Sequence, residues 1–286
     1  MDKTVIIAEA GINHSGSLET AKKLIDVAAE NGCIFKLQKR NPDLCVPEHQ
    51  KNQPRETPWG TMTYLEYKHR IEFGKEEYDE IDRYCKEKGI QWSASVWDLD
   101  SLKFMMQYDV PFLKVPSALI TNTELVRETA RWCEYKGMKF IASLGMSTEE
   151  EIHGLINNLR GHIKADNVVL MWCNSSYPAP VNELNLKVLE KIRYKYNAWY
   201  NVHWGYSGHE LSLVTTAASI YLGAEYLERH VTIDKLMYGT DQKCSLEPWE
   251  LKQLVQYVRE LEQAYGNDKI EVTESQIPIR KKLRGN

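Results

Sequence analysis

Short apolar runs alternate with amphipathic stretches along almost the whole chain. Residues 4–11 (TVIIAEAG) have the composition of a buried β-strand. Residues 17–32 then repeat apolar positions at helical spacing, with Ser17 able to cap the start and Gly32 able to end the helix. The apolar face of this predicted helix consists of Leu18, Ala21, Leu24, Ile25 and Ala28. The pattern predicts a strand followed by a helix that packs against it.

The same unit recurs eight times within roughly 265 residues. The predicted strands cover residues 4–11, 34–39, 91–96, 112–117, 139–145, 168–174, 200–207 and 225–232. The predicted helices cover residues 17–32, 75–89, 98–109, 122–137, 147–162, 184–196, 210–223 and 247–266. The helix at 147–162 begins with a capping-box pattern from Ser147 to Glu150. Residues 40–74 show no strong period.

Eight strand–helix units predict an α/β fold, a closed (β/α)8 TIM barrel. The alternative is a doubly wound sheet, but that fold usually carries a Gly-rich phosphate loop after its first strand. The sequence EAGINHSGS at that place lacks the GxGxxG spacing. We expect the barrel to occupy residues 1–267, and residues 268–286 to form a C-terminal tail or the remnant of a linker.

Composition narrows the class of protein. Of the 286 residues, 43% are hydrophobic and 27% charged, which is typical of a large core under a solvated surface. A net charge of −4 gives no indication of a nucleic-acid partner. No apolar run approaches the roughly 20 residues that span a bilayer, and the N-terminal residues resemble a first strand, not a signal peptide. Six scattered cysteines without a CxxC motif favour free thiols and a cytoplasmic location.

Polar side chains gather where the predicted strands end, which is where TIM-barrel enzymes place their active sites. These residues are Glu9, Lys36, Gln38, Ser93, Ser95, Lys114, Ser117, Ser143, Asn174, Ser175, Tyr177, Ser207, His209, Glu228, Arg229, His230 and Asp241. Each has an ordinary structural explanation when taken alone: a buried lysine pairs with a carboxylate, a serine caps a helix, and a histidine packs in the core. Their joint position favours an active site.

The residue types indicate the chemistry. Two lysines and an arginine in a barrel mouth are costly to desolvate unless an anion accompanies them. Nearby serine hydroxyls suit phosphate or carboxylate oxygens. Two histidines on adjacent strands with a nearby carboxylate suit a divalent metal that keeps open positions. We therefore expect a phosphorylated, anionic substrate and a second substrate bound at a metal.

Seven motifs follow one another along the chain: EAGINHSGS, FKLQK, KVPS, SLGMS, CNSSYPAP, GYSGHE and YLERHVTIDK followed by YGTD and SLEP. Together they make the chain resemble the sialic acid synthase (N-acetylneuraminate synthase) family. The middle stretch PWGTMTYLEYKHRIEF also resembles the family. The resemblance implies a cytoplasmic transferase of the TIM-barrel class. Its substrates would be phosphoenolpyruvate and a sugar aldehyde, such as N-acetylmannosamine or a related aldose, and its product a nonulosonic acid.

The resemblance also assigns roles to residues of this chain. His209 and His230 correspond to the metal ligands, with manganese as the expected ion and magnesium or cobalt as alternatives. The groups around the acceptor and the reacting centre are Glu9, Gln38, Tyr177 and Asp241. The phosphoenolpyruvate pocket is expected to comprise Lys36, Lys114, Ser117, Ser143, Ser175 and Ser207, with Ser95 a weaker candidate. Arg229 is either part of this site or a structural ion-pair partner of Glu9 or Glu228.

The chain departs from the family pattern in three places. Leu119 stands where a carboxylate is usual, and Ser175 where an asparagine is frequent. The family usually carries an antifreeze-like domain after the barrel, and the sequence ends where the linker to that domain would begin. The family's homodimer uses that domain, so a homodimer of this chain would need another interface.

Two other functions stay open at this point. A Schiff-base aldolase would use Lys36 or Lys114 as its nucleophile. A non-catalytic homologue would bind a sugar phosphate without turning it over.

Overall fold

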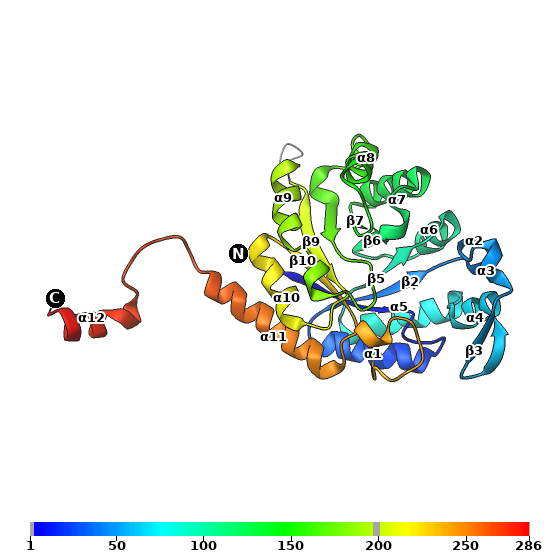
Figure 1. Ribbon diagram of the computed structural model, residues 1–286, viewed down its shortest axis with the longest axis horizontal. Helices are drawn as coiled ribbons and strands as arrows, with labels where there is room; N and C mark the ends of the chain where they lie inside the picture. The colour runs from blue at the N-terminus through cyan, green and yellow to red at the C-terminus, as the bar shows by residue number, and fades with distance from the viewer. Residues whose placement is uncertain (1–2, 197–200, 286) are drawn as a thin grey trace.

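Eight parallel strands close into a barrel in the computed structural model, which describes residues 3–196 and 201–285 (Figure 1). The strands are β1 (Val5–Gly11), β2 (Ile34–Lys39), β5 (Trp92–Val96), β6 (Phe112–Val115), β7 (Lys139–Ser143), β8 (Val168–Trp172), β9 (His203–Gly208) and β10 (Tyr226–His230). Each strand pairs with the next in this order, and β10 pairs with β1. The predicted (β/α)8 barrel is confirmed.

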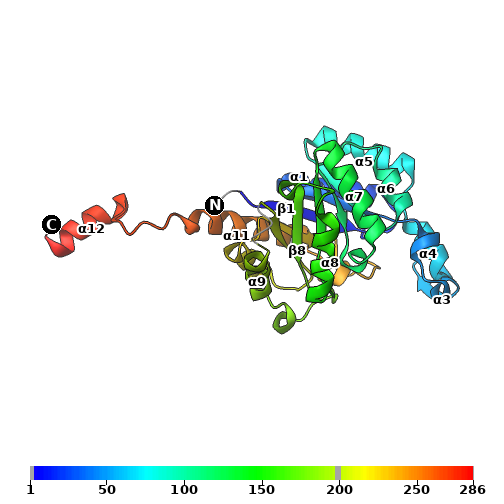
Figure 2. The same ribbon diagram turned by 90° about the horizontal axis from the view of Figure 1, so that it is seen from above.

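Helices connect the strands and cover the outside of the barrel (Figures 1 and 2). They are α1 (Leu18–Glu30), α5 (Lys75–Lys88), α6 (Leu99–Met105), α7 (Thr123–Lys136), α8 (Glu149–Leu159), α9 (Lys187–Lys195), α10 (Leu213–Ala218) and α11 (Pro248–Tyr265). All eight predicted helices are present, although α6 and α10 are shorter than expected because their last turns change to other backbone conformations.

Local capping explains where the helices begin. Ser17 accepts a hydrogen bond from the Thr20 backbone amide at 3.2 Å, so α1 starts as predicted. The capping box of α8 lies one residue later than predicted: Thr148 and Glu151 form it. The Ser147 hydroxyl instead donates to the Gly145 carbonyl at 3.0 Å and stabilises the preceding loop.

Two apolar layers hold the barrel. The larger lies between the strands and the helices, where outward-facing strand residues such as Phe35, Leu113 and Leu227 are fully buried. The smaller fills the barrel interior near the amino ends of the strands and is formed by Ile7, Phe112, Ile141, Val169 and Met171. Above this interior layer the inward-facing residues become polar, so the core itself sets the floor of the site.

Residues 40–74, which showed no period, form an excursion between β2 and α5. It contains α2 (Pro42–Cys45), α3 (Glu48–Lys51), the antiparallel hairpin β3 (Pro54–Thr57) and β4 (Gly60–Thr63), and α4 (Tyr64–Ile71). Figure 1 shows this excursion at the end of the molecule opposite the C-terminus. Tyr67 and Ile71 of α4 pack on Ile12 in the β1–α1 loop. The excursion therefore borders the carboxyl ends of the strands.

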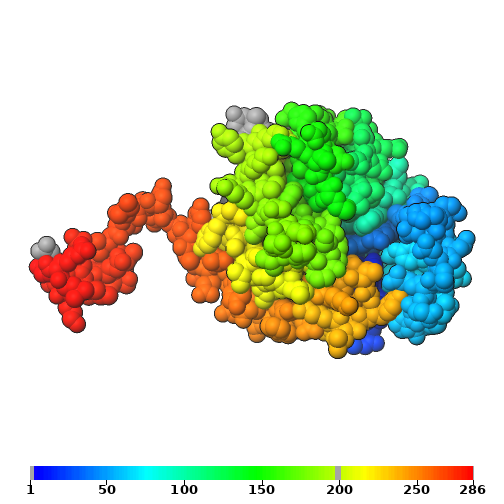
Figure 3. Space-filling view, viewed as in Figure 1, coloured from blue at the N-terminus to red at the C-terminus, as the bar shows by residue number. Residues whose placement is uncertain are grey.

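The chain after α11 leaves the barrel. Helix α12 (Ile277–Arg284) is exposed along its length and stands off from the body of the protein in the space-filling view (Figure 3). The division of the chain after residue 267 stays a prediction. Across the described residues, no helix combines the length and the apolar character that crossing a membrane requires.

Candidate active site

The inward-facing residues of neighbouring strands meet in one polar layer. Strand pairing places Glu9 of β1 level with His230 of β10 and with Lys36 of β2. On the other side, Gln38 of β2 is level with Ser95 of β5, and Ser95 with Lys114 of β6. Side chains that alternate along single strands thus come together around the barrel axis.

Two lysines and two glutamates form a buried network at the base of this layer. Lys36 Nζ lies 2.7 Å from Glu9 Oε1 and 3.5 Å from Glu228 Oε2. Lys114 Nζ donates to Glu228 Oε1. All four side chains are at most 4% exposed. Such charges are tolerated in an interior because each cation has a carboxylate partner.

Serine hydroxyls complete the network. Lys36 Nζ donates to Ser95 Oγ at 2.8 Å, and Ser207 Oγ donates to Glu228 Oε1 at 3.0 Å. The Ser143 hydroxyl is buried and, among the described residues, has no hydrogen-bond partner. An unpartnered buried hydroxyl is costly, so Ser143 is a ready donor for a ligand oxygen.

The charges set the protonation states. Burial alone would raise the pKa of Glu9, but Lys36, His230 and Lys114 outweigh it and hold the pKa well below its ordinary value. Burial would lower the pKa of Lys114, but Glu228 and Glu9 raise it above its ordinary value. Glu9 is therefore a carboxylate and Lys114 an ammonium at neutral pH.

A cavity of about 150 Å³ lies directly above this network. Every residue assigned a role at the metal, the acceptor or the phosphoenolpyruvate pocket lines it except Lys36 and Asp241. The lining comprises Glu9, Gln38, Ser95, Trp97, Lys114, Pro116, Ser117, Ala118, Ser143, Met146, Cys173, Ser175, Tyr177, Ser207, His209, Glu228 and His230. Lys36 is fully buried beneath the cavity. Asp241 Oδ2 lies 3.9 Å from His230 Nδ1, so the loop after β10 does bring Asp241 to the site.

The two histidines face each other across one side of the cavity, with ring centroids 5.5 Å apart. His209 Nδ1 hydrogen-bonds the Asn174 carbonyl at 2.5 Å, which leaves Nε2 as the free nitrogen. Burial and the charge of His230 lower the pKa of His209 to about 3, so its imidazole is neutral. His230 Nδ1 is buried with no hydrogen-bond partner among the described residues.

These features fit a divalent metal. A neutral imidazole whose second nitrogen is fixed by a carbonyl is the usual form of a metal-binding histidine. The described residues contain no cluster of three or more His, Cys, Asp or Glu side chains arranged around a metal position. The site therefore offers two histidines and leaves further coordination positions for substrate or water, with Glu9 Oε2 3.7 Å from His230 Nε2.

The loops at the mouth carry the remaining predicted residues. Ser117 begins the short helix η1 (Ser117–Leu119) after β6, and its hydroxyl lies 3.1 Å from that of Ser175. Tyr177 is 47% exposed and its ring lies 4.2 Å from that of His209. Leu119, at the position where the family pattern has a carboxylate, packs against the apolar core and presents no polar group.

Gly11 lets β1 end close to the histidine pair. Its φ of +54° is in the left-handed region, where a side chain is strained. A Cβ atom there would lie 3.1 Å from Gln38 Nε2 and 3.2 Å from His230 Cε1. The absence of a side chain at Gly11 gives both functional groups their room.

Arg229 does not belong to the cavity. It points outward from β10, is fully buried, and donates to the Glu210 carbonyl and, at 2.8 Å, to Thr216 Oγ1. Its carboxylate partner is Glu210, with Arg229 Nη1 3.8 Å from Glu210 Oε1, and not Glu9 or Glu228 as predicted. Carboxylates of the protein already balance Lys36, Lys114 and Arg229, so burial of these cations does not by itself indicate a bound anion, and the anionic substrate expected at the lysines stays a prediction.

The most consequential residue to which the sequence assigned no role is Glu228, which bridges both lysines. The sequence held a signal for it: Glu228 precedes His230 by two residues, so both face the barrel interior. Cys173 and Trp97 also line the cavity and were not predicted. Burial raises the pKa of Cys173, which keeps it an unreactive thiol.

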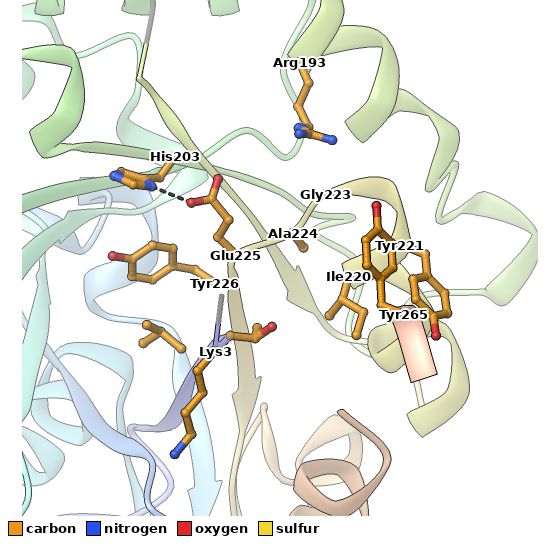
Figure 4. Close-up of a pocket in the computed structure, with 12 residues that line it drawn as sticks. Lys3, Arg193, His203, Ile220, Tyr221, Gly223, Ala224, Glu225, Tyr226 and Tyr265 are labelled. Carbon is orange, nitrogen blue, oxygen red and sulfur yellow. Dashed lines mark hydrogen bonds and ion pairs between the residues drawn. The ribbon is translucent and has the colours of Figure 1, made fainter. Parts of the chain in front are cut away.

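A larger cavity of about 420 Å³ opens at the other end of the barrel (Figure 4). It lies beside the amino ends of β1, β9 and β10 and is lined by Arg193, His203, Glu225 and Tyr265 among others. His203 Nδ1 lies 2.5 Å from Glu225 Oε2, so these two groups satisfy each other. TIM-barrel active sites lie at the carboxyl ends of the strands, which favours the smaller cavity.

Comparison with known proteins places the chain in a family. Residues 24–270 match the model of the NeuB family, and the chain belongs to that family. It is 38% identical over 259 residues to the N-acetylneuraminate-9-phosphate synthase of Drosophila melanogaster, covering 89% of this chain and 67% of the relative. It is 34% identical to the N,N'-diacetyllegionaminic acid synthase of Campylobacter jejuni, covering 93% of this chain and 79% of the relative.

A solved structure shares the architecture. The N-acetylneuraminic acid synthetase of Leptospira borgpetersenii, crystallised in complex with citrate, superposes with a TM-score of 0.83 at 28% identity. The alignment covers 100% of this chain and 94% of that chain.

Proposed function

We propose that this NeuB-family chain condenses phosphoenolpyruvate with a sugar aldehyde and gives a sialic-acid-like ulosonic acid and phosphate. The observation that carries the proposal is the cavity in which an ion-paired lysine layer and a pair of histidines face the same space. The named relatives are synthases of N-acetylneuraminate 9-phosphate and diacetyllegionaminic acid, and this common chemistry supports the same reaction class here.

The lysine side of the cavity suits phosphoenolpyruvate. Lys114 and Ser207, both bonded to Glu228, can turn toward the phosphate and carboxylate oxygens of the substrate. Ser143, whose hydroxyl lacks a partner among the described residues, supplies a further donor. Ser117 and Ser175 stand beside them at the mouth.

The histidine side suits the acceptor. His209 and His230 would hold the divalent ion, with manganese proposed and magnesium or cobalt as alternatives. When bound, such an ion supplies Lewis-acid polarisation of the aldehyde oxygen. Tyr177, whose ring lies 4.2 Å from that of His209, and Gln38, which donates to Glu9 Oε1 at 3.0 Å, orient the sugar chain.

The reaction proposed for this site forms one carbon–carbon bond and releases phosphate. C3 of phosphoenolpyruvate forms a bond to the aldehyde carbon, and C2 becomes electron-deficient. Water adds to C2, the bond from C2 to the phosphate oxygen breaks, and phosphate leaves. Glu9 is ionised, so at this site it accepts a proton of the attacking water and relays it to the oxyanion formed from the aldehyde, which becomes a hydroxyl. The remaining hydroxyl proton at C2 leaves with the phosphate as the C2 carbonyl forms. Asp241, beside His230, orients the acceptor.

The raised pKa of Lys114 argues against the Schiff-base alternative. A nucleophilic lysine needs a lowered pKa, whereas Glu228 and Glu9 hold this amine in its charged form. Lys36 is sealed beneath the cavity by two carboxylates and is out of reach of a substrate carbonyl.

The assay measures phosphate release from phosphoenolpyruvate with manganese, a panel of aldoses and a chelator control. We expect release that requires both the metal and one acceptor class. His230→Ala should lose activity and bound manganese measured by elemental analysis, whereas His153→Ala, an exposed histidine on α8, should keep both. Release by His230→Ala at the wild-type rate would refute the metal assignment, and no release with any acceptor would refute the function.

Two further proposals concern the cellular compartment and the oligomeric state. All six cysteines are free, and five of them are buried, which supports a reducing, cytoplasmic compartment. A homodimer remains proposed, with the excursion at residues 40–74 as the candidate interface because Trp59 there is 40% exposed.

A further inference from the structure

Three cations beside the cavity have no carboxylate partner. Arg40, Arg55 and Lys68 all belong to the excursion between β2 and α5. Within residues 3–196 and 201–285, none of the three forms an ion pair. The nearby carboxylate of Glu72 is occupied by Lys39, whose Nζ lies 2.7 Å from Glu72 Oε1.

Aromatic rings and neutral groups hold these cations instead. The Arg40 guanidinium lies 3.7 Å from the ring centroid of Trp97, and its Nε is buried without a hydrogen-bond partner among the described residues. The Arg55 guanidinium lies 4.5 Å from the Tyr67 ring, and its Nε donates to Tyr238 Oη at 2.7 Å. Cation–π contacts fix the positions of the charges but do not neutralise them.

The three charges act on one another. Burial and the charges of Arg40 and Arg55 lower the pKa of Lys68 to about 8, although Asp241 and Glu72 oppose this. Like charges held together in a partly buried place destabilise the protein unless an anion joins them. The lysines of the barrel layer pair directly with carboxylates, whereas Asp241 and Glu72 act on Lys68 without forming an ion pair with it among the described residues.

The cluster adjoins the catalytic cavity. Arg40 donates to the side-chain carbonyl of Gln38, and both Gln38 and Trp97 line that cavity. A separate cavity of about 50 Å³ is bordered by Arg40, Lys68 and Tyr64, and also by Glu72, whose carboxylate pairs with Lys39. This is several times the space that one water needs, so a small anionic group has room between the cations.

We propose that Arg40, Arg55 and Lys68 bind a phosphate substituent of the acceptor sugar, while its aldehyde end faces the histidine pair. This inference rests on the proposed function, since the acceptor enters the same cavity. It makes the excursion a specificity element, and it makes phosphorylated aldoses the preferred acceptor class. Arginine forks and a lysine are the groups that proteins use to bind phosphate.

The first test compares N-acetylmannosamine with its 6-phosphate as acceptors, using the full chain, manganese and phosphoenolpyruvate. We expect kcat/KM to favour the phosphate by about 100-fold or more, since charge-assisted hydrogen bonds to several donors are lost with the neutral sugar. Lys68→Met should lower that preference ratio by about 10-fold or more. The matched control is Lys51→Met in the same excursion, because Lys51 already pairs with Glu48 at 2.7 Å.

The outcomes separate the two proposals. A preference for the neutral sugar, or an unchanged ratio in Lys68→Met, overturns the phosphate site and leaves the synthase function intact. A rise in the KM of phosphoenolpyruvate with no change for the acceptor also overturns it, because the cluster would then serve the other substrate.

If no acceptor turns over, the synthase function fails, and calorimetric binding still decides the site. Mannose 6-phosphate should bind at least 10-fold more tightly than mannose, and Lys68→Met should remove that difference. Equal binding of the two sugars to the wild-type chain would refute the site.

Discussion

Removal of Lys36 tests whether the buried lysines and glutamates are stable in the barrel because each charge has a partner of opposite sign. Lys36 is fully buried and contacts two carboxylates, with Glu9 at 2.7 Å and Glu228 at 3.5 Å. In Lys36→Met, Lys114 is the remaining lysine that pairs with these glutamates, and it contacts Glu228 and not Glu9. Removing one partner of a buried pair costs about 3–5 kcal/mol because the other charge is left uncompensated. At about 2 °C per kcal/mol for a chain of this size, the melting temperature should fall by about 6–10 °C.

Urea unfolding and calorimetry measure this loss, with two companion variants. Lys36→Met combined with Glu9→Gln should recover most of the stability, because one cation and one anion leave together. Lys75→Met is the control: its exposed pair with Asp79 should contribute less than about 1 kcal/mol.

The pH dependence has a defined sign. The pKa of Glu9 is lowered in the folded wild-type protein, so its stabilisation is present above the unfolded pKa and is lost as the pH falls through the folded pKa. Lys36→Met removes the cation that lowers the pKa of Glu9 most, so the difference in stability between variant and wild type should shrink in acid. A loss below about 1 kcal/mol, or no recovery in the double variant, would refute the compensation argument.

Three other variants probe the architecture around the site. Arg229→Met leaves the buried Glu210 carboxylate without its cation and should cost about 3–5 kcal/mol in urea unfolding, while the KM of the folded fraction stays near wild type; a large KM change would place Arg229 in the site. Gly11→Ala forces a Cβ within 3.2 Å of His230 at a φ of +54°, and should lower manganese affinity in equilibrium dialysis by about 10-fold; unchanged affinity would contradict this. Ser143→Ala removes an unpartnered buried hydroxyl, so it should leave thermal stability unchanged or slightly higher while raising the KM of phosphoenolpyruvate by about 10-fold; an unchanged KM would exclude it as a ligand donor.

Much of the fold could be predicted because its signals are local. The eight strands and eight helices follow from short-range apolar periodicity, and alternation along β2 placed Lys36 and Gln38 on one face. The capping box of α8 was misplaced by one residue because Ser147 and Thr148 are equally good caps by type. Only the loop hydrogen bond of Ser147 to Gly145 distinguishes them.

The sequence alone determined the barrel and the set of side chains at its mouth, because alternation decides which way a side chain points and strand ends decide where it lies. The tertiary structure decided which charges pair. Glu228 joins Lys36 and Lys114, Arg229 turns to Glu210, and within the described residues Arg40 and Lys68 form no ion pair with a carboxylate. These partners lie on different strands or loops, so their contacts depend on the register with which eight strands close and on the path of the 40–74 excursion. The register of the strands and the path of residues 40–74 depend on packing between distant parts of the chain. Local apolar periodicity does not predict that packing.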